Sequence, residues 1–368
     1  MSSTLKSIMT RNQTQISVKG RLTKVPVIQV AGFDIVSSGR CLRQAAIKDE
    51  DYVELDPAAN PEELIAGIKR QHFKADIFSF AQRIPDTAIR HPYPFHLDNV
   101  AAVPLTTFDD WWKELPQATR KNVRRSERRG VAVRVSSLDQ QLAQGIKSIY
   151  DETPIRQGRR FWHYGKDVER VLRENSTYSE RSDFIAAFHQ EELIGFIKLV
   201  YVGKTAQIMQ ILSKNQHFDK RPANALLAQA VEVCCRKGMS FFVYGKYIYG
   251  NKSDSELIEF KRRNGFKQIE YPRYYVPLSP LGRLAIKCGL HRGWRSWLPP
   301  RMESLLLDLR SKYYARRLPG EKSKPDLAEL DQKEEAGSRS PLTHAAARAA
   351  LPQGPAGVDS AKSSLAKK

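Results

Sequence analysis

The chain has 368 residues, with 60 Lys and Arg against 40 Asp and Glu and a formal net charge of +20. A hydrophobic fraction of 41% with 15 Phe, 14 Tyr and 5 Trp supports real cores and excludes a wholly disordered chain. The length suggests about two domains. So positive a charge favours phosphates, nucleic acid or an anionic membrane as partners, and it says nothing about the fold.

The cysteines and the apolar runs limit the classes of protein further. Cys41, Cys234, Cys235 and Cys288 form no C-x-x-C pair and no Cys/His cluster with zinc spacing, so we expect no metal site. The first fifteen residues lack the apolar run of a secretory signal, and no window approaches the ~18 uncharged apolar residues of a spanning helix. We expect a cytoplasmic protein, with peripheral attachment to the inner face of the cytoplasmic membrane as the alternative.

The first third of the chain predicts a small α/β unit. Residues 1–15 are expected to be flexible, and the unit covers 16–107. Asn60 and Pro61 are typical of a helix start, with Pro at the first helical position. The strands expected here are 24–31, 52–55, 75–82 and 98–108, because each is short and rich in β-branched or aromatic residues.

A second α/β unit is expected over 108–278. Gly130, Gly238 and Gly265 follow helical patterns and are expected to end them. The expected helices are 108–115, 116–130, 138–152, 166–175, 224–238 and 254–265. The expected strands are 131–135, 183–190, 192–202, 206–213, 239–245 and 266–278.

The C-terminal part divides into a basic segment and a polar one. The stretch 278–317 holds nine Lys and Arg against two Asp and Glu, with Leu and Trp interleaved. We interpret 279–317 as a basic amphipathic helical extension that binds an anionic membrane surface, or alternatively packs on the preceding domain. Residues 318–368 contain no Phe, Tyr or Trp and are expected to be a disordered tail.

Three stretches in the second unit carry a resemblance to a known family. They are WWKELPQATRKNVRRSERRGVAVRV, the run from AQIMQILS to FFVYG, and SELIEFKRRNGFKQI. In this order they resemble GNAT N-acyltransferases, in the version found in Fem-type peptidoglycan aminoacyltransferases and related acyltransferases of cell-wall and exopolysaccharide pathways. The resemblance implies a mixed sheet flanked by helices, in two tandem units of which 16–107 is a degenerate first copy.

The resemblance also implies an activity. It predicts an enzyme that transfers an acyl group from acyl-CoA to an amine of a cell-envelope or polysaccharide precursor, by direct attack through a tetrahedral intermediate. Acyl-CoA would then be a co-substrate, with no bound cofactor. Two other readings stay open: a tRNA-dependent aminoacyl transferase of the same fold, and a catalytically degenerate protein that binds RNA or membrane.

The donor site departs from the usual acetyltransferase pattern. A Gly-rich loop ordinarily presents backbone N–H groups to the coenzyme A pyrophosphate at a helix N-terminus. Residues 215–224 contain no glycine, and Pro222 removes one donor. We therefore expect side chains to bind the donor, namely Lys220, Arg221, Asn224 and Tyr247.

The candidate catalytic groups are Tyr244, Lys261 and His163. Tyr244 ends a buried strand, where a phenol could protonate the leaving group, although buried tyrosines more often only pack. Lys261 matches the lysine of the Fem-like ending, which implies a role in binding donor phosphate or stabilising negative charge. His163 could act as a general base near neutral pH.

The loop 154–165 has the most unusual local sequence, with three Arg, three aromatic residues and one His. Long aromatic loops are often functional. We expect Arg156, Arg160 and Tyr164 to contact the substrate, whereas Phe161 and Trp162 are expected to anchor the loop.

Overall fold

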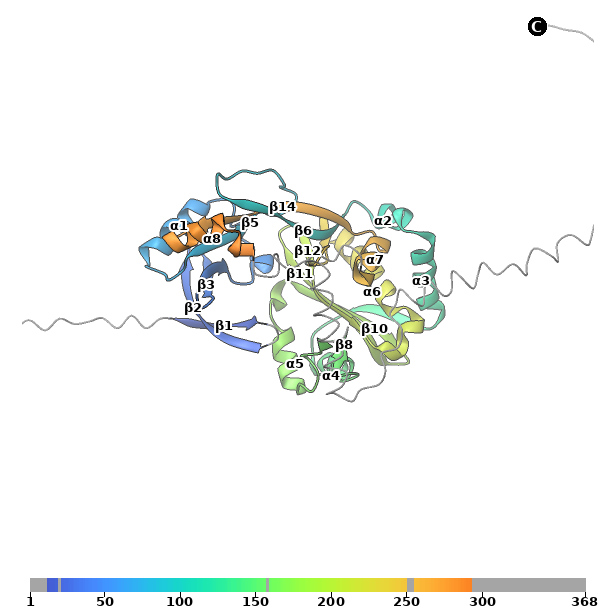
Figure 1. Ribbon diagram of the computed structural model, residues 1–368. Helices are drawn as coiled ribbons and strands as arrows, with labels where there is room; N and C mark the ends of the chain where they lie inside the picture. Colours follow the sequence, from blue (N-terminus) through green and yellow to red (C-terminus); the bar gives the residue numbers. More distant parts are fainter. Residues whose placement is uncertain (1–11, 19–20, 157–158, 250–254, 293–368) are drawn as a thin grey trace, which may run out of the picture. The chain divides into compact units, whose positions relative to one another are not determined.

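The computed structural model describes residues 12–18, 21–156, 159–249 and 255–292 (Figure 1). All of them belong to one compact unit, Met1–Lys324. The expected tail and most of the expected extension 279–317 lie outside the described residues. No helix in the described part of the chain is long and apolar enough to cross a bilayer.

In the described residues, twelve strands form one sheet, and two short strands form a separate hairpin. The strands of the sheet are β1 (Gln13–Val18), β2 (Arg21–Val30), β3 (Phe33–Ser38), β4 (Gln44–Ile47), β5 (Ile77–Ala81), β6 (Phe95–Pro104), β7 (Val131–Ser136), β10 (Ser182–His189), β11 (Glu192–Val202), β12 (Thr205–Ser213), β13 (Phe241–Val243) and β14 (Lys267–Pro277). The hairpin consists of β8 (Ile155–Arg156) and β9 (Arg159–Arg160).

Helices connect most of these strands. The α-helices of the described residues are α1 (Pro61–Arg70), α2 (Phe108–Glu114), α3 (Gln117–Arg128), α4 (Gln140–Tyr150), α5 (Val168–Asn175), α6 (Pro222–Arg236), α7 (Glu256–Arg263) and α8 (Pro280–Lys287). Four 3-10 turns are η1 (Glu50–Tyr52), η2 (Ser179–Arg181), η3 (Asn215–Lys220) and η4 (Leu290–Arg292).

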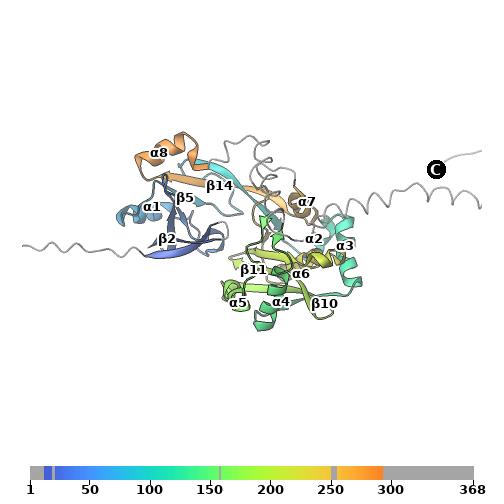
Figure 2. The ribbon, with the colours of Figure 1, turned by 60° about the horizontal axis from the view of Figure 1, so that its bottom comes forward.

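The sheet joins the two halves of the sequence. Its strand order is β1-β2-β3-β4-β5-β14-β6-β13-β12-β11-β10-β7. The last strand of the chain, β14, pairs antiparallel with β5 and with β6 (Figure 2). The expected boundary at 107–108 falls between β6 and α2, and the sheet continues across it.

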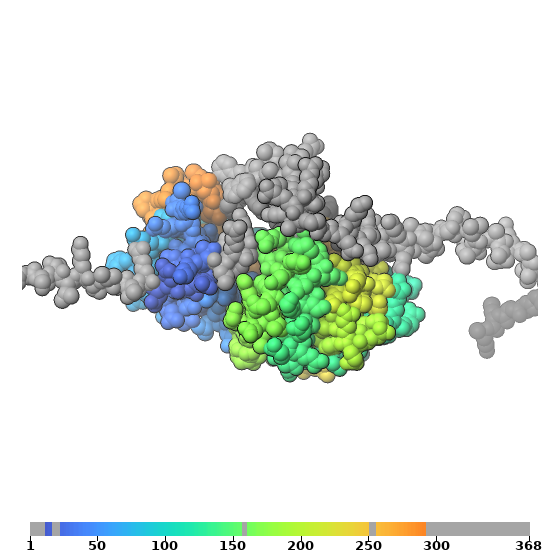
Figure 3. Space-filling model, turned by 90° about the horizontal axis from the view of Figure 1, so that it is seen from below, coloured from blue at the N-terminus to red at the C-terminus, as the bar shows by residue number. Residues whose placement is uncertain are grey.

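Helices bury both faces of the second half of the sheet. α6 packs on one face, where Ile197 and Leu199 of β11 belong to its core cluster. α4 and α5 pack on the other, together with Phe196 of β11. Alternation along β11 therefore supplies two cores, as expected for a strand covered on both sides. Figure 3 shows the outer surface of α4 and α5 in green.

One expected strand is wrong. Residues 52–55 were expected to be extended, but Glu50–Tyr52 is a 3-10 turn. The carboxylate of Glu50 accepts a hydrogen bond from the backbone N–H of Ala81 at 2.9 Å and pairs with Arg273 at 2.8 Å. These contacts hold the segment against β5 and β14 as a turn. The sequence analysis also missed β1, β3 and β4. The first of these begins at Gln13, so residues 13–15 are paired with β2 and the expectation that they are flexible was wrong.

Candidate active site at the end of strand β13

Two neighbouring parallel strands separate at the centre of the sheet. β12 pairs with β13 only through Thr205–Gln207 and Phe241–Val243. Beyond this point β12 continues beside β11 as far as Ser213, with a register irregularity opposite Lys198 and Leu199. The chain after β13 instead follows β6, because Tyr244 donates its backbone N–H to the carbonyl of Ala101 at 2.8 Å. The distal half of β12 thus has no strand partner on this side among the described residues.

A buried lysine lies where the strands separate. Lys261 of α7 is 0% exposed, and its ammonium donates a hydrogen bond to the carbonyl of Lys246 at 2.6 Å. The same nitrogen lies 4.4 Å from the ring centre of Tyr244 and 5.0 Å from that of Tyr249. Burial lowers the pKa of Lys261 to about 8. The protonated form therefore predominates at neutral pH, held by one carbonyl and two ring faces.

A glycine separates Tyr244 in the chain from the loop that carries Tyr249. Burial raises the pKa of Tyr244 well above its usual range, so its phenol keeps its proton. Gly245 has φ of +53°, and a Cβ at this position would lie 2.8 Å from the Tyr249 hydroxyl. Only glycine allows this hydroxyl to lie so close to the end of β13.

The position of α7 is set by amide contacts at its end. Asn264, which follows α7, donates to the carbonyl of Phe260 at 2.7 Å. Its backbone carbonyl accepts the indole N–H of Trp111 at 3.2 Å. Asn224, in the first turn of α6, donates to the side-chain oxygen of Asn264 at 3.1 Å. The buried amide of Asn224, expected to bind the donor, is therefore used to join α6 to the lysine-bearing helix.

The other expected donor-binding residues differ in their exposure. Arg221 adopts a left-handed conformation with φ of 55° and is 2% exposed, so its side chain presents no surface to a phosphate. Lys220 is half-buried and lies 3.7 Å from the carboxylate of Asp219, which Arg129 also binds at 2.6 Å. Tyr247 packs at the edge of the core formed with α6.

His163 lies in a second cluster, beside the distal half of β12. Its ring centre is 4.5 Å from that of Tyr150, and its Nδ1 is 3.2 Å from the ammonium of Lys166. Its Nε2 is 3.5 Å from the side-chain nitrogen of Gln210 of β12. Burial and Lys166 lower the pKa of His163 to about 4. The imidazole is neutral at pH 7 and too weakly basic to suit the expected role of general base.

Arg156 forms a clamp within the protein. Its guanidinium donates to the carbonyls of Ser213 and Ile149, each at 3.2 Å, and to Glu152 at 3.0 Å. The carboxylate of Glu152 accepts the backbone N–H of Asn215 at 2.8 Å. Arg156 therefore fixes the end of β12 to η3, whereas we expected it to contact the substrate. The other two expected substrate contacts are exposed: Arg160 at the end of β9, and Tyr164 in the loop that leads to α5.

The sequence analysis missed a chain of ion pairs behind the site. Asp98 of β6 accepts from Lys246 at 2.6 Å and from Arg273 of β14 at 3.2 Å, and Arg273 also binds Glu50. Lys246 lies three residues after the last residue of β13, Val243, so this network ties the loop at the site to the first half of the sheet. The only signal in the sequence was isolated charged residues within otherwise apolar strands. In the described residues, no group of three His, Cys, Asp or Glu could hold a metal ion.

No family model matches the chain. A segment of 84 residues is 29% identical to a spermidine N(1)-acetyltransferase of Thermoplasma acidophilum, covering 23% of this chain and 50% of that protein. The chain thus matches about half the length of that relative.

Two solved structures are similar over most of the chain. FemX superposes with a TM-score of 0.51 and 13% identity, covering 75% of this chain and 90% of FemX. L-PGS from Bacillus licheniformis superposes with a TM-score of 0.47 and 15% identity, covering 72% of this chain and 88% of L-PGS. The likeness to FemX shows that the chain shares the fold of FemX over three quarters of its length.

Proposed function

We propose that the protein transfers an acyl group from acyl-CoA to an amine of a cell-envelope or polysaccharide precursor. The separation of β12 from β13 carries the proposal, because it leaves strand backbone without a strand partner beside a buried cation and two tyrosines. The partial match to an acetyltransferase supports a thioester donor. The envelope acceptor rests on the resemblance to Fem-type enzymes.

The donor would lie along the distal half of β12. The pantetheine arm of coenzyme A contains two amides, which can pair with the N–H and C=O groups that β13 leaves unpaired. Its thioester would then reach the end of β13, near Tyr244. Lys220, at the turn before α6, is the expected donor-binding residue that retains some exposure for a phosphate.

The reaction needs no acylated residue. The neutral amine attacks the thioester carbon, a C–N bond forms, the C–S bond breaks, and one proton passes from the amine to the leaving thiolate. The phenol of Tyr244 is protonated and can donate a hydrogen bond to the sulfur as charge develops there. Lys261 is buried beneath both tyrosines, so it acts through them as a positive charge that positions and polarises the site.

A tRNA-dependent aminoacyl transfer is the second candidate. The glycine-free segment before α6 favours it, and so do the exposed cations Lys121, Arg124 and Arg128 of α3. Arg124 also lies 5.8 Å from the ring centre of Trp112. These cations could contact a nucleic-acid backbone, a contact that coenzyme A does not require.

The two donors can be separated by measuring ligand-induced stabilisation. Acetyl-CoA at a hundred times its Kd should stabilise the protein by about 2.7 kcal/mol, which raises the Tm by several degrees. Free thiol should then appear when an acceptor amine is added. Stabilisation by aminoacyl-tRNA, with no response to acetyl-CoA, would replace the first proposal with the second. No response to either donor would reject both.

A further inference from the structure

Helix α8 exposes two leucines while it buries a glycine and an alanine, and only Ile286 of its large apolar side chains packs on the core. Gly282 packs so tightly that a Cβ there would lie 1.9 Å from the backbone oxygen of Asp76, and Ala285 is buried beside Tyr275. Leu281 and Leu284 point outward and are 47% and 58% exposed. Amphipathic helices normally bury leucine before alanine and glycine. The inversion indicates that the outer leucines have a partner other than the domain core.

More of the same surface is apolar and basic. Leu290 of η4 is 50% exposed, and Arg283 and Lys287 of α8 are exposed between the leucines. Neither cation forms an ion pair or a side-chain hydrogen bond within the described part of the chain. Both charges are therefore available to an anionic partner that also accepts leucine.

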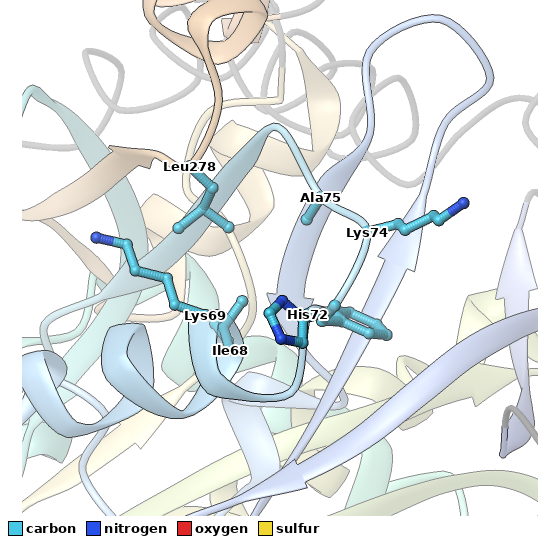
Figure 4. Close-up of a pocket in the computed structure, with 7 residues that line it drawn as sticks. Ile68, Lys69, His72, Lys74, Ala75 and Leu278 are labelled. Atoms are coloured by element: carbon cyan, nitrogen blue, oxygen red, sulfur yellow. The ribbon is translucent and has the colours of Figure 1, made fainter. Parts of the chain in front are cut away.

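A hollow adjoins the start of α8. It has a volume of about 310 Å³ and is lined by Ile68, Lys69, His72, Phe73, Lys74, Ala75 and Leu278 (Figure 4). Lys69 and Lys74 extend from it in opposite directions. The two cations do not converge on one point, so they suit several separate phosphates better than a single bound anion.

Asp76 lies at the start of α8 and forms no ion pair with Lys69 or Lys74 in the described part of the chain. Asp76 accepts the backbone N–H of Arg43 at 2.8 Å and the hydroxyl of Ser279 at 2.7 Å, so both of its oxygens are engaged. Ser279 is also the N-cap of α8. The carboxylate thus fixes the start of the helix in place through two neutral donors.

We infer that α8, η4 and the rim of the adjoining hollow form a docking surface for an anionic phospholipid bilayer. The outer leucines would enter the interfacial region, while Arg283, Lys287, Lys69 and Lys74 contact lipid phosphates. The charge of residues 293–317 favours a membrane, rather than these residues themselves, as the partner of the outer leucines. They carry six Lys and Arg against two Asp and Glu. Like charges disfavour packing of residues 293–317 on α8, whereas an anionic surface attracts both segments.

The inference is tested by sedimenting the full chain with vesicles, without any assay of acyl transfer. One set contains phosphatidylcholine alone, and the other contains equal parts of phosphatidylcholine and phosphatidylglycerol. We expect binding to the anionic set only, weakened by salt. Leu281→Ala and Leu284→Ala should each weaken it roughly fivefold, as burial of half a leucine side chain predicts. Arg283→Gln and Lys287→Gln should each cost about fivefold.

Matched controls lie at the other end of the sheet. Val135→Ala removes an equally exposed apolar side chain from β7, and Lys113→Gln removes an exposed cation from α2. Both variants should bind the anionic vesicles as the unmodified chain does. Equal binding to neutral vesicles, or leucine variants that bind normally, would overturn the inference.

Two further outcomes would also overturn it. A lower Tm of the leucine variants without vesicles would mean that the chain itself covers these side chains. Complete competition by inorganic phosphate would mean that the cations bind one soluble anion. Because acyl transfer is not measured, failure here leaves the proposed function untouched, and the converse also holds.

Discussion

The ammonium of Lys261 lies 4.4 Å from the centre of the Tyr244 ring, inside the protein and at the end of β13. Burying a lysine with no exposed surface lowers the free energy of unfolding, since its charge loses hydration. Here that charge lies where two parallel strands separate. The pair therefore connects the fold to the proposed chemistry, and the first predictions concern it.

Replacing Lys261 with Met should remove the charge and retain most of the side-chain volume. If the buried cation stabilises developing negative charge, kcat/KM should fall by about 10²–10³. Lys198→Met is the matched control, because Lys198 is also buried, also has a pKa of about 8, and donates to Asn175 and Thr177 away from this site. That variant should lose stability and keep its kcat. Equal activity losses in both variants would indicate a purely structural role.

The pH dependence of stability should report the same buried charge. The pKa of Lys261 falls from 10.5 to about 8 on folding, so between these values the unfolded chain binds more protons. Stability should therefore rise with pH from about 8 towards 10, by up to about 1.4 kcal/mol per pH unit for one proton. Below pH 8 the penalty for burying the charge is fully present.

Denaturant unfolding of Lys261→Met across this pH range provides the comparison. The free energy of unfolding of the variant should rise less steeply with pH than that of the unmodified chain. The difference in slope should correspond to the uptake of one proton. Lys198 contributes a similar slope in both proteins, so it cancels in the difference. Identical slopes would show that Lys261 titrates normally in the folded state.

Gly245→Ala should damage the site more than an ordinary glycine substitution does. The variant has a strained positive φ, and its Cβ would displace the Tyr249 hydroxyl, 2.8 Å away. Gly203 has a similar φ of +55°, but a Cβ added there would meet no atom within 4 Å. Gly203→Ala therefore measures the backbone strain alone, about 1 kcal/mol. We expect loss of activity only at Gly245, partly rescued by Tyr249→Phe. Equal losses of activity at both glycines would contradict this reading.

Arg156→Ala should reduce stability by about 3 kcal/mol, because it leaves the half-buried carboxylate of Glu152 without its ion-pair partner. Glu152→Gln should lower stability through the same contacts, so the double variant should cost less than the sum of the two. A double-mutant cycle by thermal or denaturant unfolding measures this coupling. An increase in the KM for the acceptor with unchanged stability would instead support the substrate contact that the sequence predicted for Arg156.

His163→Gln should leave the neutral limb of the pH–rate profile unchanged, because the imidazole has a pKa of about 4 and is already neutral there. Its folded pKa lies below the ordinary value of 6.5, so the unfolded chain binds the additional proton as pH falls between these values. The unmodified chain should lose stability from pH 6.5 to 4, and the variant should lose less. A shifted neutral limb would identify His163 as the base.

Local patterns in the sequence predicted most of the helices and strands of the second half. Asn60 and Pro61 begin α1 as expected, and the strand expected over 192–202 is β11. The short segments around β3 and β4 escaped notice because four to six residues carry little periodicity. The turn at Glu50 was misread as a strand because its conformation depends on Ala81 and Arg273, both distant in sequence.

By itself, the sequence determined an α/β chain whose order of elements resembles that of GNAT acyltransferases. It singled out Tyr244 as the end of a buried strand and Lys261 by its match to the Fem-like ending. Tertiary structure alone decided that Lys261 is buried, that Arg156 and Asn224 bind protein groups, and that β14 lies between β5 and β6. It also decided that α8 exposes leucines and cations on one surface. Periodicity reports which face of an element is apolar, whereas burial of a polar side chain depends on partners far away in the sequence.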